Sequence, residues 1–174
     1  VQPMEGGLDQ VNDNLQRIRE LAVQGANDTN TADDRAAIET EINERLAEID
    51  RVADSNNFNG TNLLNSGGVS LSIQVGSNTE AEDVIEVATV DATVAGLALA
   101  SGNSAITGST FDSTAVSAAS GGAAQAFQNL IDSVDTATSA LDTNRATLGA
   151  TLNRFDSVID NLATTSTNLT EARS

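Results

Sequence analysis

The chain has 174 residues, enough for one ordinary domain or one extended helical module. Its 25 acidic residues outweigh 8 basic ones, all arginine, and the resulting formal net charge of −17 disfavours nucleic acid and anionic membranes as partners. Cys and His are both absent, which excludes disulfides, thiolate chemistry and imidazole bases, so neither an enzyme nor a metal or cofactor site is expected.

A first helix is predicted over residues 3–28. Its apolar residues recur at alternating spacings of three and four, the pattern of a heptad seam, at Met4, Leu8, Val11, Leu15, Ile18 and Ala22. Pro3 suits the first helical turn because its missing N–H costs nothing there. Gly25 and the polar stretch 27–30 then predict the end of the helix and a short connection.

A second helix is predicted over residues 32–54. Thr31 is the expected N-cap, and Asp34 three residues later makes a near capping box. One face is apolar, at Ile38, Ile42, Leu46, Ile49 and Ala53. The short connection makes this helix an antiparallel neighbour of the first. Its charged residues are expected to face water and to form i,i+4 pairs such as Glu41–Arg45.

A β-hairpin is predicted over residues 69–90, after a turn at 56–60. Apolar and polar residues alternate from Val69 to Val75, and a β-branched run from Val84 supplies a second strand of uncertain register. Residues 91–117 are mostly Ala, Ser, Thr and Gly, which predicts a loosely patterned, variable connection.

A long third helix over residues 118–172 is the strongest prediction. Ten of thirteen positions at alternating spacings of four and three are apolar, and no proline interrupts them. The positions are Phe127, Ile131, Val134, Thr138, Leu141, Arg145, Leu148, Leu152, Phe155, Ile159, Leu162, Ser166 and Leu169. Burial of this seam offsets the entropy of ordering about 50 residues only if the helix packs against others. Arg145 is expected to pair with an acid of a facing helix; the alternative is a register-setting or partner contact.

These elements predict a mainly α fold, an elongated antiparallel three-helix coiled-coil-like bundle with a β-hairpin, formed by residues 1–174 as one domain. The sequence contains no run of about 18 apolar residues, the length that would predict a membrane span. The first residues also lack the basic and apolar pattern of a signal peptide.

The segment 15–24 closely resembles the signature of bacterial flagellin. Further segments resemble that family in the same order along the chain, at 41–52, 58–60, 72–76, 148–155, 161–162 and 168–174. The resemblance implies the rod domain of a short flagellin, in which the stretch 91–117 stands where many members carry an inserted outer domain.

The resemblance also implies a function. Flagellins are structural proteins that leave the cell unfolded through the flagellar type III export apparatus, served by an export chaperone and without a cleaved signal. They then polymerise outside the cell with other flagellin subunits into the filament that drives motility. Family members continue at both ends with segments that form the innermost coiled coil of the filament. This chain is therefore expected not to polymerise alone, and its long helix near 150–174 to be exposed, frayed or paired with another molecule.

In many flagellins the first two helices form the surface recognised by Toll-like receptor 5. The matching residues here are Gln16, Arg17, Leu21, Glu41 and Arg45, with Arg154 from the last helix. Leu21 lies off the heptad seam and Arg17 one turn before it, so both are expected to face outward as a hot-spot pair. Subunit packing in the filament explains the same exposed residues equally well.

Two other hypotheses for a structural protein remain. A hook–filament junction protein shares the terminal helices of flagellin, although the match at 15–24 favours flagellin itself. A flagellin-like cell-surface binding module, for example for a polysaccharide, is the second alternative. The absence of Trp and Tyr argues against it, because sugars commonly stack on such rings.

Overall fold

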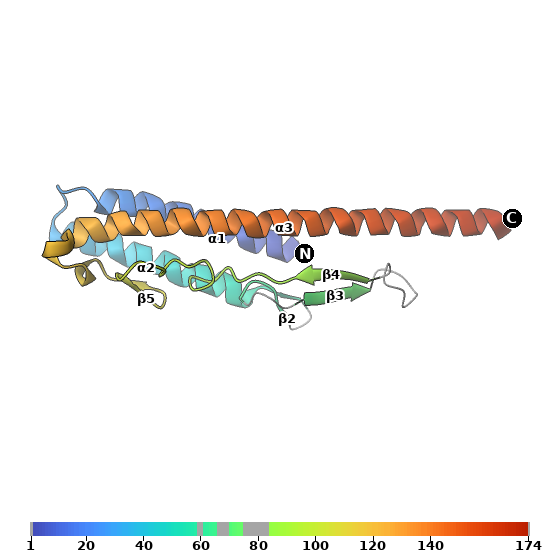
Figure 1. Cartoon of the computed structure of the whole chain (residues 1–174), viewed down its shortest axis with the longest axis horizontal. Helices are drawn as coiled ribbons and strands as arrows, with labels where there is room; N and C mark the ends of the chain where they lie inside the picture. The colour runs from blue at the N-terminus through green and yellow to red at the C-terminus, as the bar shows by residue number, and fades with distance from the viewer. Residues whose placement is uncertain (1, 59–60, 66–69, 75–83, 174) are drawn as a thin grey trace.

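The computed structural model describes residues 2–58, 61–65, 70–74 and 84–173, which form an elongated rod (Figure 1). Its long axis follows three helices, α1 (Gln2–Gly25), α2 (Ala32–Ser55) and α3 (Gly122–Arg173). Helix α1 runs antiparallel to both of the others and contacts each of them. The 52-residue α3 is more than twice as long as the 24-residue α1, so it continues well beyond the start of α1. The predicted mainly helical fold with a hairpin is confirmed, with helix bounds shifted by a few residues.

The predicted seam of α1 is fully inside the core. All six seam residues are buried, with at most 1% of their surface exposed. Four further residues off this seam, Gly7, Asn14, Leu21 and Gly25, are buried as well. Because α1 packs against two helices at once, its buried stripe is wider than the two-position seam of a coiled-coil pair.

The connection between α1 and α2 ends in the capping box that the sequence predicts. Oγ1 of Thr31 accepts from the backbone N–H of Asp34 at 3.1 Å, and Oδ2 of Asp34 accepts from the N–H of Thr31 at 3.0 Å. Two of the N–H groups that a helix start leaves without partners are satisfied in this way.

The predicted β-hairpin is confirmed in its described part. Strands β3 (Ser70–Gln74) and β4 (Val84–Ala88) pair antiparallel, with Leu71 opposite Val87 and Ile73 opposite Ile85. The predicted hairpin residue Val69 and the stretch 75–83 lie outside the described residues. A shorter ladder joins β1 (Asn57–Phe58) to β2 (Thr61–Asn62) at the predicted turn.

The predicted connection over 91–117 is ordered, although its sequence pattern is loose. The stretch carries β5 (Ile106–Thr107), β6 (Thr110–Phe111) and η2 (Ser113–Ala115), and η3 (Ala118–Ser120) follows it. Seven of its apolar residues are buried in the common core: Ala92, Val94, Leu97, Leu99, Ala105, Ile106 and Phe111. Their irregular spacing matches neither helical nor strand periodicity, so no sequence pattern marked them.

Polar side chains on one face of α2 hold this segment in place. The side chain of Asn43 exchanges two hydrogen bonds with the backbone of Phe111, accepting at 2.7 Å and donating at 3.1 Å. Seven residues further along α2, Oδ1 of Asp50 accepts from the N–H of Val94 at 2.9 Å. The segment runs back along α2 to the start of α3 and packs beside the three helices as a fourth element of the rod (Figure 1).

Gly25, the last residue of α1, is needed for close packing against α3. A Cβ at this position would lie 2.3 Å from the ring of Phe127, so only glycine lets α3 approach so closely. The Phe127 ring also packs on Phe111, with ring centroids 5.2 Å apart.

Burial changes along α3. Phe127, Leu130, Val134 and Leu141 are fully buried, whereas Leu152, Phe155 and Val158 are only partly buried and Ile159 is 41% exposed. The predicted seam side chains of Leu162, Ser166 and Leu169 lie outside the described side chains. As expected for residues near 150, α3 leaves the bundle and projects along the rod axis (Figure 1).

Candidate interaction surface

An ion pair between α1 and α2 lies at the centre of the predicted surface. Nε of Arg17 donates to Oε2 of Glu41 at 2.8 Å, and its Nη1 donates to Oε2 of Glu20 at 3.1 Å. These hydrogen bonds, the one to Glu41 first, raise the pKa of the Arg17 guanidinium above its ordinary value. The side chains of Arg17 and Glu41 stay 40% and 34% exposed, so a partner can reach both.

Arg45 extends this surface along the boundary between α1 and α2. The predicted i,i+4 pair between Glu41 and Arg45 is wrong, because Glu41 turns to Arg17 across the helices. Nη1 of Arg45 instead donates to Oδ1 of Asn14 on α1 at 3.5 Å. The exposed Gln16 donates to Oδ1 of Asn12 at 3.4 Å.

The prediction that Leu21 faces outward is wrong. Its side chain is only 3% exposed and belongs to the core. The expectation assumed that α1 buries only a two-position seam, whereas α1 contacts both α2 and α3 and therefore buries a wider stripe. Leu21 supports the surface from beneath and offers no apolar contact to a partner.

Arg154 lies apart from the other predicted residues. It is exposed on the part of α3 that follows Leu148, beyond the last fully packed turn. The structure therefore brings together Arg17, Glu41 and Arg45 at the boundary between α1 and α2, whereas Gln16 bonds within α1 and Arg154 lies on α3. Glu20 is the surface residue that sequence reasoning missed, and its i,i+3 spacing from Arg17 is a signal that could have found it.

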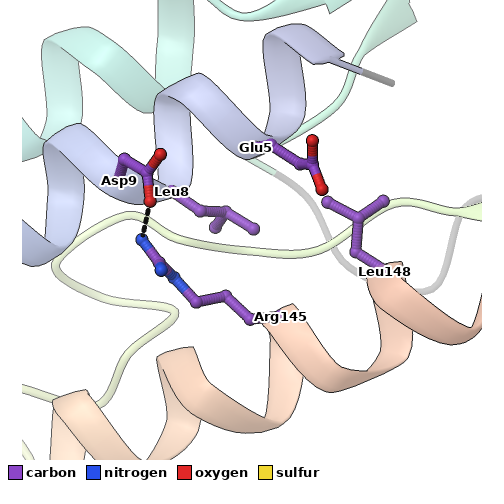
Figure 2. A pocket seen from close by; sticks show the side chains of 5 residues that line it. All are labelled: Glu5, Leu8, Asp9, Arg145 and Leu148. Atoms are coloured by element: carbon purple, nitrogen blue, oxygen red, sulfur yellow. Dashed lines mark hydrogen bonds and ion pairs between the residues drawn. The ribbon is translucent and has the colours of Figure 1, made fainter. Parts of the chain in front are cut away.

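Two more ion pairs join α1 to α3. Nη2 of Arg145 lies 2.5 Å from Oδ1 of Asp9, and Nε of Arg19 lies 2.9 Å from Oδ1 of Asp135. The first confirms that the seam arginine pairs with an acid of a facing helix. Figure 2 shows Arg145 reaching from α3 across a cavity of about 270 Å³ to Asp9, with Glu5 at the other side.

None of this geometry provides for metal chemistry within the described residues. Among them, no group of three or more His, Cys, Asp or Glu side chains could hold a metal ion. None of the described helices combines the length and the apolarity that crossing a bilayer requires.

Two family models match the chain. The bacterial flagellin N-terminal helical region matches residues 1–68, and the bacterial flagellin C-terminal helical region matches residues 131–174. Together they account for more than half of the sequence, and they cover α1, α2 and most of α3. The chain belongs to the bacterial flagellin family. Flagellins are structural proteins and not enzymes.

Individual flagellins are similar over different spans. Flagellin of Halalkalibacterium halodurans is 35% identical over 174 residues, which is 100% of this chain and 58% of that protein. Flagellin of Escherichia coli K12 is 46% identical over 96 residues, which is 55% of this chain and 19% of that protein. The chain thus covers less than two thirds of the length of these relatives.

Solved flagellin structures share the architecture. Bacillus cereus flagellin aligns with a TM-score of 0.68 at 26% identity, over 98% of this chain and 88% of that one. FliC from Burkholderia pseudomallei aligns with a TM-score of 0.64 at 21% identity, over 88% of this chain and 97% of that one. At that lower identity the second likeness supports the fold alone.

Proposed function

We propose that the chain is a structural subunit of the bacterial flagellar filament, where it assembles with other flagellin subunits and serves motility. Membership of the flagellin family supports this role. The observation that carries it is the outer part of α3, where the apolar seam continues in phase but Ile159 stays 41% exposed. A helix that keeps an apolar stripe outside its own core has that stripe available for a neighbouring helix.

The net charge of −17 shapes how such subunits can meet. Copies with that charge repel one another at long range, so their contacts need apolar area or well-placed arginines. The partly exposed apolar seam of α3 up to Ile159 supplies the first, and Arg17, Arg45 and Arg154 supply the second.

Immunogold electron microscopy tests this function against its two alternatives. Antibodies raised against the chain should decorate flagellar filaments along their whole length on cells that express it, and deletion of the gene should remove the filaments. Labelling confined to the base of the filament would instead support a hook–filament junction protein. Labelling of the cell body would support a surface-binding module.

The same role places the protein outside the cell. We expect export through the flagellar type III apparatus with the help of an export chaperone. A strain with an inactive flagellar export apparatus should therefore retain the protein inside the cell. A strain in which the general secretion pathway for proteins with a cleaved signal peptide is blocked should still release it. Release that persists in the first strain would contradict this route.

We further propose that the free monomer is recognised by Toll-like receptor 5 at Gln16, Arg17, Glu41 and Arg45, with Arg154 as a separate contact. The partly exposed Arg17–Glu41 pair supports this, because an accessible arginine held in place by two carboxylates loses little conformational entropy on binding. Packing in the filament would cover the same residues, so monomers and not filaments should bind.

A binding assay with the receptor ectodomain tests the assignment. Arg17→Ala and Glu41→Ala should each weaken binding by about tenfold, the effect of losing a contact of about 1.4 kcal/mol. Arg51→Ala is the matched control, because Arg51 is 63% exposed and pairs along its own helix with Glu48. Unchanged binding of both surface variants would reject the assigned residues.

A further inference from the structure

Two ion pairs join α1 to α3: in one the acid lies on α1, and in the other the acid lies on α3. On α1, Asp9 accepts from Arg145 of α3, whereas Arg19 donates to Asp135 of α3. On each helix the aspartate precedes the arginine by ten residues. An antiparallel arrangement in one register therefore satisfies both pairs at once. A parallel arrangement would place the two acids together and the two arginines together.

The apolar seam discriminates poorly between neighbouring registers. Seam residues recur every three or four positions on both helices, so a slide by one turn, about 5.4 Å, again sets apolar residues against apolar residues. In such repeating interfaces a polar contact often decides the register.

The structure shows what a one-turn slide would offer Arg145. Glu5 lies one turn before Asp9 and lines the same cavity of about 270 Å³, together with Leu8 and Leu148 (Figure 2). Nε of Arg145 is buried there without a hydrogen-bond partner among the described residues. Arg145 could thus exchange Asp9 for Glu5. The same slide would move Arg19 from Asp135 to the level of Ile131, where it gains no acid.

We propose that the two crossed ion pairs select the observed register of α1 on α3 against this one-turn slide, with Arg19–Asp135 as the discriminating contact. Both pairs are partly exposed, and such pairs add little to total stability. They act on the free-energy difference between the two registers, which the apolar seam alone leaves nearly equal in stability. At the other end of α1, the close contact of Gly25 with Phe127 is the competing steric determinant.

The absence of cysteine allows a direct test in the full chain. Asn12 and Asp142 lie between the two ion pairs, three residues from Asp9 and Arg145 respectively. A chain with Asn12→Cys, Asp142→Cys and Thr138→Cys can close a 12–142 disulfide in the observed register or a 12–138 disulfide after a one-turn slide. Equilibration in a glutathione buffer, followed by peptide mapping, gives the ratio of the two.

The ratio should favour the 12–142 disulfide by at least about tenfold, which corresponds to about 1.4 kcal/mol. Adding Asp9→Asn and Asp135→Asn should lower it at least threefold. Glu20→Gln with Glu48→Gln removes the same charge from i,i+3 pairs within single helices and should leave the ratio unchanged. Asp135→Arg alone should lower the ratio, and adding Arg19→Asp should restore it.

Two results would overturn the proposal. An unchanged ratio in the Asp9→Asn, Asp135→Asn chain, with its helical circular dichroism retained, would mean that the Gly25–Phe127 contact sets the register alone. Loss of helical signal in that chain would mean that the pairs support the fold as a whole. Because the assay uses the isolated chain, either failure leaves the proposed function standing.

Discussion

The two parts of α3 share one sequence pattern but not one environment. Over residues 122–148 the helix is packed against α1 and the segment 91–120, and its seam residues Phe127, Val134 and Leu141 are fully buried. Over residues 149–161 the same pattern leaves Leu152 and Phe155 partly buried and Ile159 exposed. The heptad repeat thus predicts which face of a helix is apolar, while the partner decides how much of that face is covered.

A pair of leucine truncations should give the largest contrast between the two parts. Leu141→Ala should lower the free energy of unfolding by about 2–5 kcal/mol, because it removes a fully buried side chain and leaves a cavity. Leu152→Ala makes the same chemical change at a partly buried site and should cost about 1 kcal/mol or less. Urea denaturation of both variants checks this. Equal losses would show that the projecting part is covered in solution.

A pair of glycine substitutions should differ in sign. Gly25→Ala should destabilise the fold by about 1–3 kcal/mol, because its Cβ would lie 2.3 Å from the Phe127 ring and force the two helices apart. Gly149→Ala should stabilise the projecting helix by about 0.5–1 kcal/mol, since nothing lies within 4 Å of the added Cβ. Thermal unfolding followed by circular dichroism measures both. Destabilisation by Gly149→Ala would place a partner against that turn.

The segment 91–120 belongs to the packed part of the molecule. Substitution of Asn43 tests how much its hydrogen bonds stabilise the packing of this segment. Asn43→Ala removes both hydrogen bonds to the backbone of Phe111 and should cost about 1–2 kcal/mol. Asn153→Ala, at an exposed site on the projecting part of α3, should change stability by less than about 0.5 kcal/mol. Hydrogen exchange adds a local readout, because only Asn43→Ala should speed exchange of the Phe111 amide. Equal exchange rates would mean that apolar packing alone holds the segment.

The packed part also shows what periodicity can and cannot predict. All six seam residues of α1 are buried as predicted, because a helix that repeats every 3.6 residues must place them on one face. The capping box at Thr31 was predictable for a similar reason, since it depends on residues three positions apart. Both are local patterns, and local geometry is nearly independent of the rest of the chain.

Contacts between distant segments were not predictable in this way. The burial of Leu21 depends on α1 having two helical neighbours, which a single helix pattern does not reveal. The pairing of Glu41 with Arg17 rather than Arg45 depends on how closely α1 and α2 approach. The packing of 91–120 depends on hydrogen bonds from Asn43 and Asp50, which lie far from it in sequence.

The smallest effect in the packed part should come from the capping box, and it should depend on pH. The backbone N–H of Thr31, and then its side chain, hold the pKa of Asp34 below the ordinary 3.8. A depressed carboxyl pKa contributes stability that is fully present above 3.8 and is lost as the pH falls through the folded-state value. Asp34→Ala should therefore lower the Tm at pH 7, and the difference from the unaltered chain should shrink below pH 3.8. Asp156→Ala, exposed on the projecting part of α3, is the matched control and should change the Tm little at either pH. A difference for Asp34→Ala that stays constant on acidification would show that its carboxylate charge does not contribute to the cap.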